Sequence, residues 1–231
     1  MDGKKIIVLA VILVLSLGAY VNEATADPTP LSECGDLNTG TYVLTQNIIS
    51  ITPYCFKLIG NDITIDLNGF TITRDGDLNF IGIWDGNLFG PRLENIVIRN
   101  GTIRNFNQGI WIDESDGCRV EGITAISNGS GIIVGNHCVV SHNIAINNSS
   151  GAILTGTDST ISYNIVNNNG SGIEINLTNV RSNILYNTAN GNFNNGINVV
   201  CPSNLIGNIT QNNGTNLLQQ LGKCKPYDSL F

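Results

Sequence analysis

Hydrophobic and polar positions repeat five times between residues 109 and 214. Each unit opens with Gly, an apolar residue, a variable residue and a second apolar residue. The opening glycines follow one another at steps of 22, 20, 21 and 24 residues, at Gly109, Gly131, Gly151, Gly172 and Gly196. Four units continue with an apolar residue, two variable residues and an Asn-Ile pair, at Asn143-Ile144, Asn164-Ile165, Asn183-Ile184 and Asn208-Ile209.

Within each unit the alternation has a period of two, which is typical of a β-strand and not of a helix. A short repeat of such strands predicts coils stacked about 4.8 Å apart, with equivalent residues above one another. We therefore expect Ile, Val and Leu inside and hydrogen-bonded ladders of the repeated Asn. Gly and Asn are expected at the corners, where tight turns need a left-handed backbone.

The pattern resembles the right-handed parallel β-helix (pectin-lyase-like) superfamily, in its short-repeat form, over residues 56–214. The resemblance implies an all-β protein built as a single-stranded right-handed parallel β-helix, a solenoid of about seven coils. Residues 27–55 are expected to cap its N-terminal end. Residues 215–231 are expected to close the other end as a short C-terminal cap and tail. In that segment Leu217, Leu218 and Leu221 predict a short amphipathic turn or helix.

The early coils are expected to be longer than the later ones. Strict alternation at residues 62–72 recurs at residues 95–103, with Gly69 and Gly101 expected to turn the corners. Residues 86–91, which contain Gly and Pro, predict a loop outside the stack.

Residues 1–26 have the pattern of a secretory signal peptide. Two lysines precede an apolar stretch at residues 6–17, and Ala24-Thr25-Ala26 is a small-x-small cleavage site. The alternative is a retained membrane anchor, for which the apolar stretch is short. We expect a secreted, periplasmic or cell-surface protein with no stable membrane span after cleavage.

Six cysteines in an exported chain indicate disulfides. We favour Cys34 with Cys55 and Cys201 with Cys224, which would fasten the two ends. For Cys118 and Cys138, at equivalent repeat positions, a disulfide and a pair of reduced thiols remain open alternatives.

Charged residues make up only 13% of the chain, and the net charge is −7. The sequence contains no basic stripe, which argues against a nucleic-acid partner. We expect no cofactor and no metal site: there is no Cys-x-x-Cys, and His137 and His142 are the only histidines. Relatives with this texture include the periplasmic copper-binding protein of nitrous-oxide reductase maturation, but two His and one Met argue against copper here.

Outward positions of the opening strands predict an exposed column. It contains both tryptophans of the chain and consists of Trp84, Trp111, Ile133, Ile153, Glu174 and Asn198. Exposed aromatic faces suit the apolar faces of sugar rings, and Asp85, Asp113 and Glu114 near the same edge can accept hydrogen bonds from hydroxyls. We therefore predict a saccharide-binding ledge. The alternative is that the loop at residues 86–91 or the chain tail covers both tryptophans.

Catalytic motifs of the superfamily are largely missing. The run Ile110-Trp111-Ile112-Asp113 resembles Trp-Ile-Asp-His of pectate lyases, but Glu114 stands where that family has His. The polygalacturonase motifs are absent, and no catalytic residue is assigned. Asp66 and Arg99 are interpreted as a structural ion pair between coils, and Asp113, Glu114 and Asp116 as a solvated acidic turn.

The sequence as a whole predicts a rigid lateral surface on an exported β-helix, with a non-catalytic role in polysaccharide binding or a structural role in the cell envelope. The alternative is a small carbohydrate-active enzyme, namely a polysaccharide lyase, hydrolase or epimerase. Fold alone does not choose between these functions.

Overall fold

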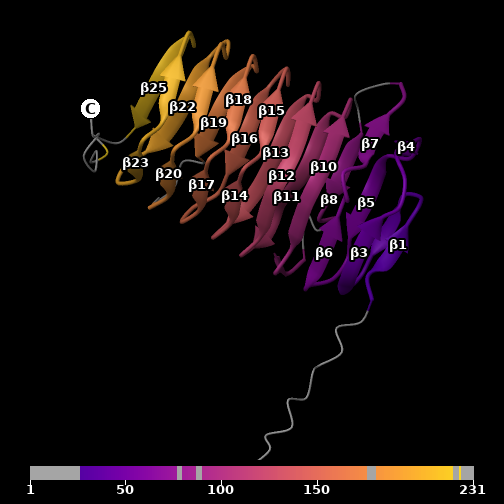
Figure 1. The fold of residues 1–231 in the computed structure, drawn as a ribbon. Helices are drawn as coiled ribbons and strands as arrows, with labels where there is room; N and C mark the ends of the chain where they lie inside the picture. The colour runs from indigo at the N-terminus through magenta and orange to yellow at the C-terminus, as the bar shows by residue number, and fades with distance from the viewer. Residues whose placement is uncertain (1–26, 77–79, 87–89, 176–180, 221–223, 225–231) are drawn as a thin grey trace, which may run out of the picture.

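The computed structural model describes residues 27–231, except residues 77–79, 87–89, 176–180, 221–223 and 225–231. Its strands succeed one another along one long axis, from indigo to yellow in Figure 1. All strand pairs are parallel, and each joins one coil to the next. The described part of the chain contains no helix, and so none that could span a membrane. The predicted signal peptide lies outside the described residues.

Three columns of strands make up the stack, two in a 15-stranded sheet and one in a 10-stranded sheet. Column 1 contains β1 (Thr29–Leu31), β3 (Gly40–Leu44), β6 (Ile63–Asp66), β10 (Val97–Arg104), β12 (Arg119–Ile126), β14 (Val139–Ser141), β17 (Thr160–Ser162), β20 (Asn183–Leu185) and β23 (Asn204–Ile206). Column 2, which shares β10 and β12, adds β4 (Ile48–Ser50), β7 (Thr71–Arg74), β15 (Ile144–Ile146), β18 (Ile165–Asn167), β21 (Thr188–Asn190) and β24 (Ile209–Gln211).

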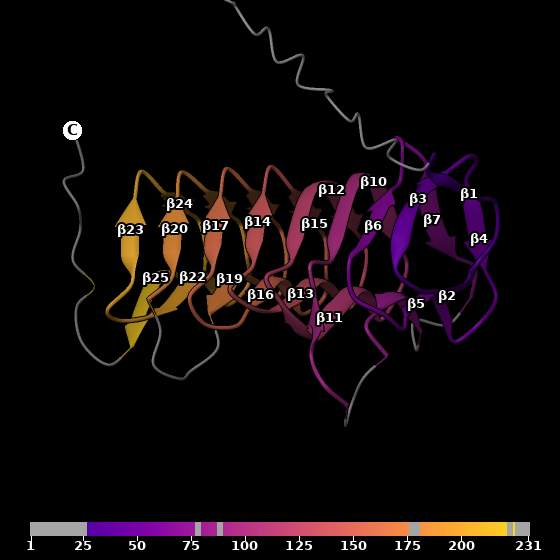
Figure 2. The ribbon, with the colours of Figure 1, turned by 90° about the horizontal axis from the view of Figure 1, so that it is seen from below.

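Column 3 forms the second sheet. It contains β2 (Gly35–Leu37), β5 (Tyr54–Leu58), β8 (Ile81–Trp84), β11 (Gln108–Asp116), β13 (Ser130–Asn136), β16 (Gly151–Thr155), β19 (Ser171–Ile175), β22 (Asn195–Val200) and β25 (Thr215–Gln220), with the short β9 (Leu93–Glu94) beside the end of β11. Figure 2 shows columns 1 and 3 as separate faces of the stack. The chain is thus an all-β parallel solenoid of about eight turns, which confirms the predicted fold class and comes close to the predicted seven coils.

Most coils have three strands where the sequence predicted two, although β10 and β12 each run through columns 1 and 2 as one strand. The predicted second strand bends at its Asn, so that Asn143 lies between β14 and β15. The residue before that Asn takes up the left-handed backbone, as His142, Tyr163 and Tyr186 show with φ of 57°, 56° and 55°. The sequence did not predict this bend because Tyr, which holds the position in two of these coils, rarely adopts a left-handed backbone.

Two registers differ by a few residues from the sequence prediction. Ile132 pairs with Ile153, not with Ala152, so Ala152 takes the place that Gly holds in the neighbouring units. Ile184 pairs with Ile161, so the Asn equivalent to Asn164 is Asn187 and not Asn183. The sequence pattern did not show these equivalences. Ala152 stands where the other units have Gly, and Thr188 stands after Asn187 where the other units have Ile after Asn.

The opening glycines serve close packing and not chain reversal. None of them has a positive φ, and a Cβ on Gly131 would press on the carbonyl oxygen of Ala152. Gly69 does turn a corner, with φ of 79°. Gly101 does not: Asn100 makes that turn with φ of 59°, while Gly101 leaves room for Leu67.

Two asparagine ladders support the bends, as the sequence predicted. One consists of Asn128, Asn148, Asn169, Asn192 and Asn213, and the other of Asn143, Asn164, Asn187 and Asn208. Within a ladder, Nδ2 of Asn148 donates to Oδ1 of Asn169 at 2.9 Å and to the Ala125 carbonyl at 3.1 Å. Buried amides are thereby satisfied from coil to coil.

Both ends of the described part of the chain continue the solenoid. The predicted N-terminal cap contributes strands that are in register with the following coils, since β1 pairs with β3 and β2 with β5. At the C-terminal end residues 215–220 form β25, paired with β22, where a turn or helix was predicted. The prediction followed the leucine spacing, but neighbouring strand edges outweigh such a local preference. Leu221 lies outside the described residues.

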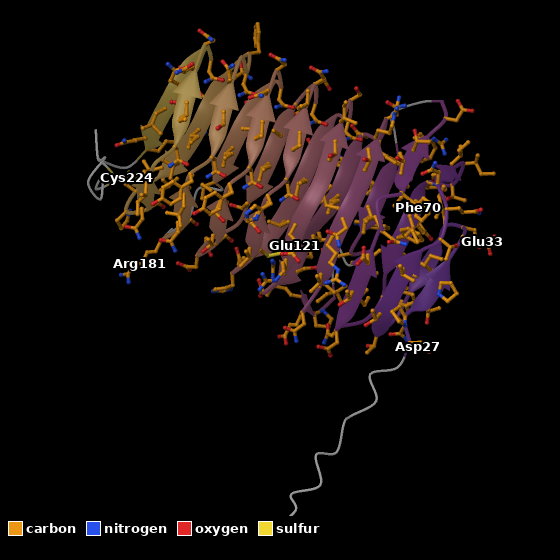
Figure 3. The ribbon with its side chains drawn as sticks, in the orientation of Figure 1. Asp27, Glu33, Phe70, Glu121, Arg181 and Cys224 are labelled. Atoms are coloured by element: carbon orange, nitrogen blue, oxygen red, sulfur yellow. A yellow bond between two sulfur atoms is a disulfide. The ribbon has the colours of Figure 1, made fainter. Side chains whose placement is uncertain are left out.

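Three disulfides each join two neighbouring coils. The pairs Cys34–Cys55, Cys118–Cys138 and Cys201–Cys224 have Cα–Cα distances of 4.5, 4.5 and 4.8 Å, close to the spacing of adjacent strands. The two favoured pairings are confirmed, and the third, left open by the sequence, is a disulfide. In Figure 3 Cys224 lies at the C-terminal end of the stack, opposite the end marked by Glu33 and Phe70.

Candidate binding groove on column 3

Side chains that point outward from column 3 stand in one line along the stack. Pairing between neighbouring strands puts the following residues in register: Lys57, Trp84, Trp111, Ile133, Leu154, Glu174 and Asn198. All are half-buried. Ile153, predicted for this column, is fully buried, and Leu154 takes its place because of the register shift at Ala152.

An open groove of about 650 Å³ runs along this line across β11, β13, β16, β19 and β22. Its apolar floor consists of Trp111, Ile133 and Leu154. Polar and charged groups border the floor, namely Arg92, Gln108, Asp113, Glu114, Asn136, Glu174 and Asn198. A groove with an apolar floor and a polar border is the usual form of a small-molecule or glycan site.

The two tryptophans stack along the column, as predicted. Their ring centroids lie 6.5 Å apart, and the Trp84 ring lies 5.8 Å from that of Tyr54. Lys57 Nζ lies 5.6 Å from the Trp84 ring. Trp84 is therefore packed between neighbours beside the groove, whereas Trp111 lines it and is open to a ligand.

Arg92 fixes the acidic end of β11. Its Nη1 donates to Glu114 at 3.0 Å, and its Nη2 donates to the carbonyls of Asp113 at 2.6 Å and Ser115 at 3.1 Å. Its Nε lies 3.0 Å from Asp116, as an ion pair without an aligned hydrogen bond. Contrary to the predicted solvated acidic turn, two of the three carboxylates here, those of Glu114 and Asp116, are paired with this one guanidinium.

Asp85 lies beneath the border of the groove and not on it. Its side chain is buried, and Oδ2 accepts hydrogen bonds from the Glu114 backbone N–H at 2.8 Å and from Ser115 Oγ at 3.3 Å. Burial, and then the negative charge of Asp113, raise the pKa of Asp85 to about 6. Asp85, expected as a ligand-binding residue, instead holds the segment that carries Asp113 and Glu114.

The other candidate groups lie apart from the groove. Asp66 and Arg99 pair at 2.9 Å on adjacent coils of column 1, as predicted. His137 is exposed, and His142 stacks on Tyr163 with ring centroids 5.2 Å apart. Within the described residues, no three His, Cys, Asp or Glu side chains are grouped so that they could hold a metal ion.

Comparison with known proteins places the chain in a family. Residues 46–219 match the family described as periplasmic copper-binding protein (NosD), which is most of the chain. The chain belongs to the NosD family. Together with the three disulfides, membership of the NosD family indicates an extracytoplasmic protein. No curated protein matches it.

Two solved structures resemble this NosD family member in fold. The Dettilon tailspike protein (gp208) has a TM-score of 0.58 and 15% identity over 78% of this chain, which spans only 46% of the tailspike chain. Pectate lyase Pel9A has a TM-score of 0.56 and 14% identity, and the likeness covers 86% of this chain and 68% of the lyase. These identities show the fold alone, a right-handed parallel β-helix of the pectin-lyase-like type.

Copper, named in the description of the NosD family, does not fit the residues described here. Proteins bind copper through Cys thiolates, Met thioethers and imidazoles. All six cysteines of this chain are in disulfides, and the chain has one Met. His142 is engaged in the stack with Tyr163.

Proposed function

We propose that this chain binds polysaccharide without cleaving it, in the groove on column 3 of an extracytoplasmic β-helix. The observation that carries the proposal is the open, elongated groove with Trp111, Ile133 and Leu154 aligned along its floor. Apolar ring faces of sugars pack on such a floor, while hydroxyls bond to Gln108, Asn136 or Asn198 beside it. The polymer would then lie along the solenoid axis.

The positions of the carboxylates favour binding over catalysis. Glycoside hydrolysis uses two carboxyl groups about 5 to 10 Å apart. Of the acidic groups that line the groove, Glu114 is paired with Arg92. Asp113 and Glu174 belong to β11 and β19, three strand steps or roughly 14 Å apart along the axis. Asp85, with its raised pKa, is buried.

Replacing Trp111 with Ala is expected to weaken binding of the glycan selected on a glycan array by about tenfold or more, because the ring supplies most of the aromatic floor. The affinity is measured by titration calorimetry. Tyr186→Ala is the matched control, since Tyr186 is about half exposed on the corner between columns 1 and 2. Equal affinity of both variants and the parent protein would contradict the proposal.

The enzymatic alternative is tested on the same glycan. We expect no new reducing ends and no absorbance of unsaturated uronides after prolonged incubation with the protein. Product formation that is lost in the Trp111→Ala variant would replace the binding role with a lyase or hydrolase role.

A further inference from the structure

Charge is uneven along the lining of the groove. Three of its four charged residues are acidic, and the one cation, Arg92, is held by Glu114 and Asp116 and by two carbonyls. No Lys or Arg of the described residues forms an ion pair with Asp113 or Glu174. The groove therefore presents two uncompensated carboxylates to a ligand.

These two carboxylates stand at separate points of the groove. Asp113 belongs to its β11 end, next to Trp111, and Glu174 lies in register between Leu154 and Asn198. Glu174 is half-buried, and partial removal of water strengthens its attraction for a cation. The net charge of −7 adds a general negative potential. A ligand that satisfies both groups has to be extended, with cationic groups on more than one unit.

We infer that the groove selects glycans that carry free amino groups, and that Asp113 and Glu174 determine this specificity. The inference rests on the proposed polysaccharide-binding function. Protonated amino groups on the sugars form ion pairs with the two carboxylates, while the rings between them cover the apolar floor. Uronate polymers meet like charge at both points and are rejected. This preference differs from that named for pectate lyase Pel9A, which resembles the chain in fold.

Three hexamers with similar rings and different charge test the inference by titration calorimetry. They are a glucosamine hexamer, its N-acetylated form and a galacturonate hexamer, at about pH 5.5, where amines are protonated and exposed carboxylates are ionised. We expect the glucosamine hexamer to bind about tenfold more tightly than the N-acetylated form, an advantage that added salt reduces. We expect the galacturonate hexamer not to bind.

Glu174→Gln separates charge from shape. It is expected to weaken binding of the glucosamine hexamer about three- to fivefold and to leave the N-acetylated hexamer unaffected. Glu121→Gln is the control, because Glu121 lies on β12 in column 1 (Figure 3). Far-ultraviolet circular dichroism confirms that each variant is folded.

Several outcomes overturn the inference. Equal affinity for the glucosamine and N-acetylated hexamers removes the preference for amino groups. An oligolysine that binds as tightly as the glucosamine hexamer shows that the groove selects cations without requiring sugar rings. Binding of the glucosamine hexamer that depends on Trp111 but not on Glu174 leaves the proposed function intact and disproves only its specificity. If no glycan shows Trp111-dependent binding, both the function and the specificity are refuted.

Discussion

Replacing Asn164 with Ala is expected to lower the free energy of unfolding by about 4 kcal/mol, because a buried ladder loses one of its inner members. Asn164 Nδ2 donates to the Val140 carbonyl and to Asn187 Oδ1, both at 2.9 Å. Its Oδ1 accepts from the backbone N–H of Asn143 at 2.9 Å and from Asn143 Nδ2 at 3.1 Å. The Ala variant leaves the buried backbone N–H of Asn143 without its side-chain partner and removes the side-chain hydrogen bond to the Val140 carbonyl. Asn187 Oδ1 and Asn143 Nδ2 each lose one of their hydrogen bonds and keep another. A buried polar group left without a partner costs about 1 to 3 kcal/mol.

Urea unfolding followed by circular dichroism measures the loss. Asn204→Ala is the matched control, since Asn204 is exposed and its side chain donates one hydrogen bond, to Asn183 Oδ1 at 2.7 Å. We expect that control to change stability by about 0.5 kcal/mol or less. If both variants lose the same small amount, the ladders do not stabilise the solenoid in the way described.

Replacing Asp85 with Asn is expected to stabilise the protein at pH 7 by up to about 3 kcal/mol. The pKa of Asp85 is about 6 in the folded protein and 3.8 without the fold, so the folded state binds the proton more tightly. Ionisation therefore opposes folding, by an amount that is absent below about pH 4, grows up to about pH 6 and is complete above it. Asn retains an oxygen that accepts from Glu114 N–H and Ser115 Oγ.

The measurement is the difference in unfolding free energy between parent and variant from pH 4 to pH 8. The difference should be near zero at the acid end and rise through pH 5 to 6. Asp75→Asn, at an exposed aspartate, is the control and should give a flat difference. If the unfolding free energies of the parent and Asp85→Asn changed with pH in the same way, ionisation of Asp85 would not destabilise the folded protein.

Period and composition were sufficient to predict stacked coils of short strands, while the right-handed sense of the coil came from the resemblance to the β-helix superfamily. Alternating Ile and Val positions specify an interior stack, and repeated Asn at one place in each unit specifies a ladder, because both effects depend on side chains in register. Two of the predictions that were wrong concern places where one residue type substitutes for another. Ala152 stands where other coils have Gly, and His142, Tyr163 and Tyr186 take a backbone conformation that usually indicates Asn or Gly.

The sequence predicted the column of outward side chains at the candidate site but not the contacts of the charged groups beside it. Residue order placed Trp84 and Trp111 one above the other, since both follow the same Gly-Ile pair. It did not show that Asp85 turns inward or that Arg92 reaches back to β11, because those contacts depend on the path of the segment between β8 and β9. Leu154 was not predicted for the outward column because the register of β16 differs by one residue from the predicted register. In a strand with alternating faces, this shift puts Ile153 in the core and Leu154 on the outer face.

The three sulfur bridges have a mechanical consequence. They close separate loops with sequence separations of 21, 20 and 23 residues, near the start, the middle and the end of the stack. If the chain were pulled from its two termini, these loops could not lengthen. Extension would be confined to the chain outside these loops, which includes residues 56–117 and 139–200 between the bridges. The bridged coils would stay closed under tension.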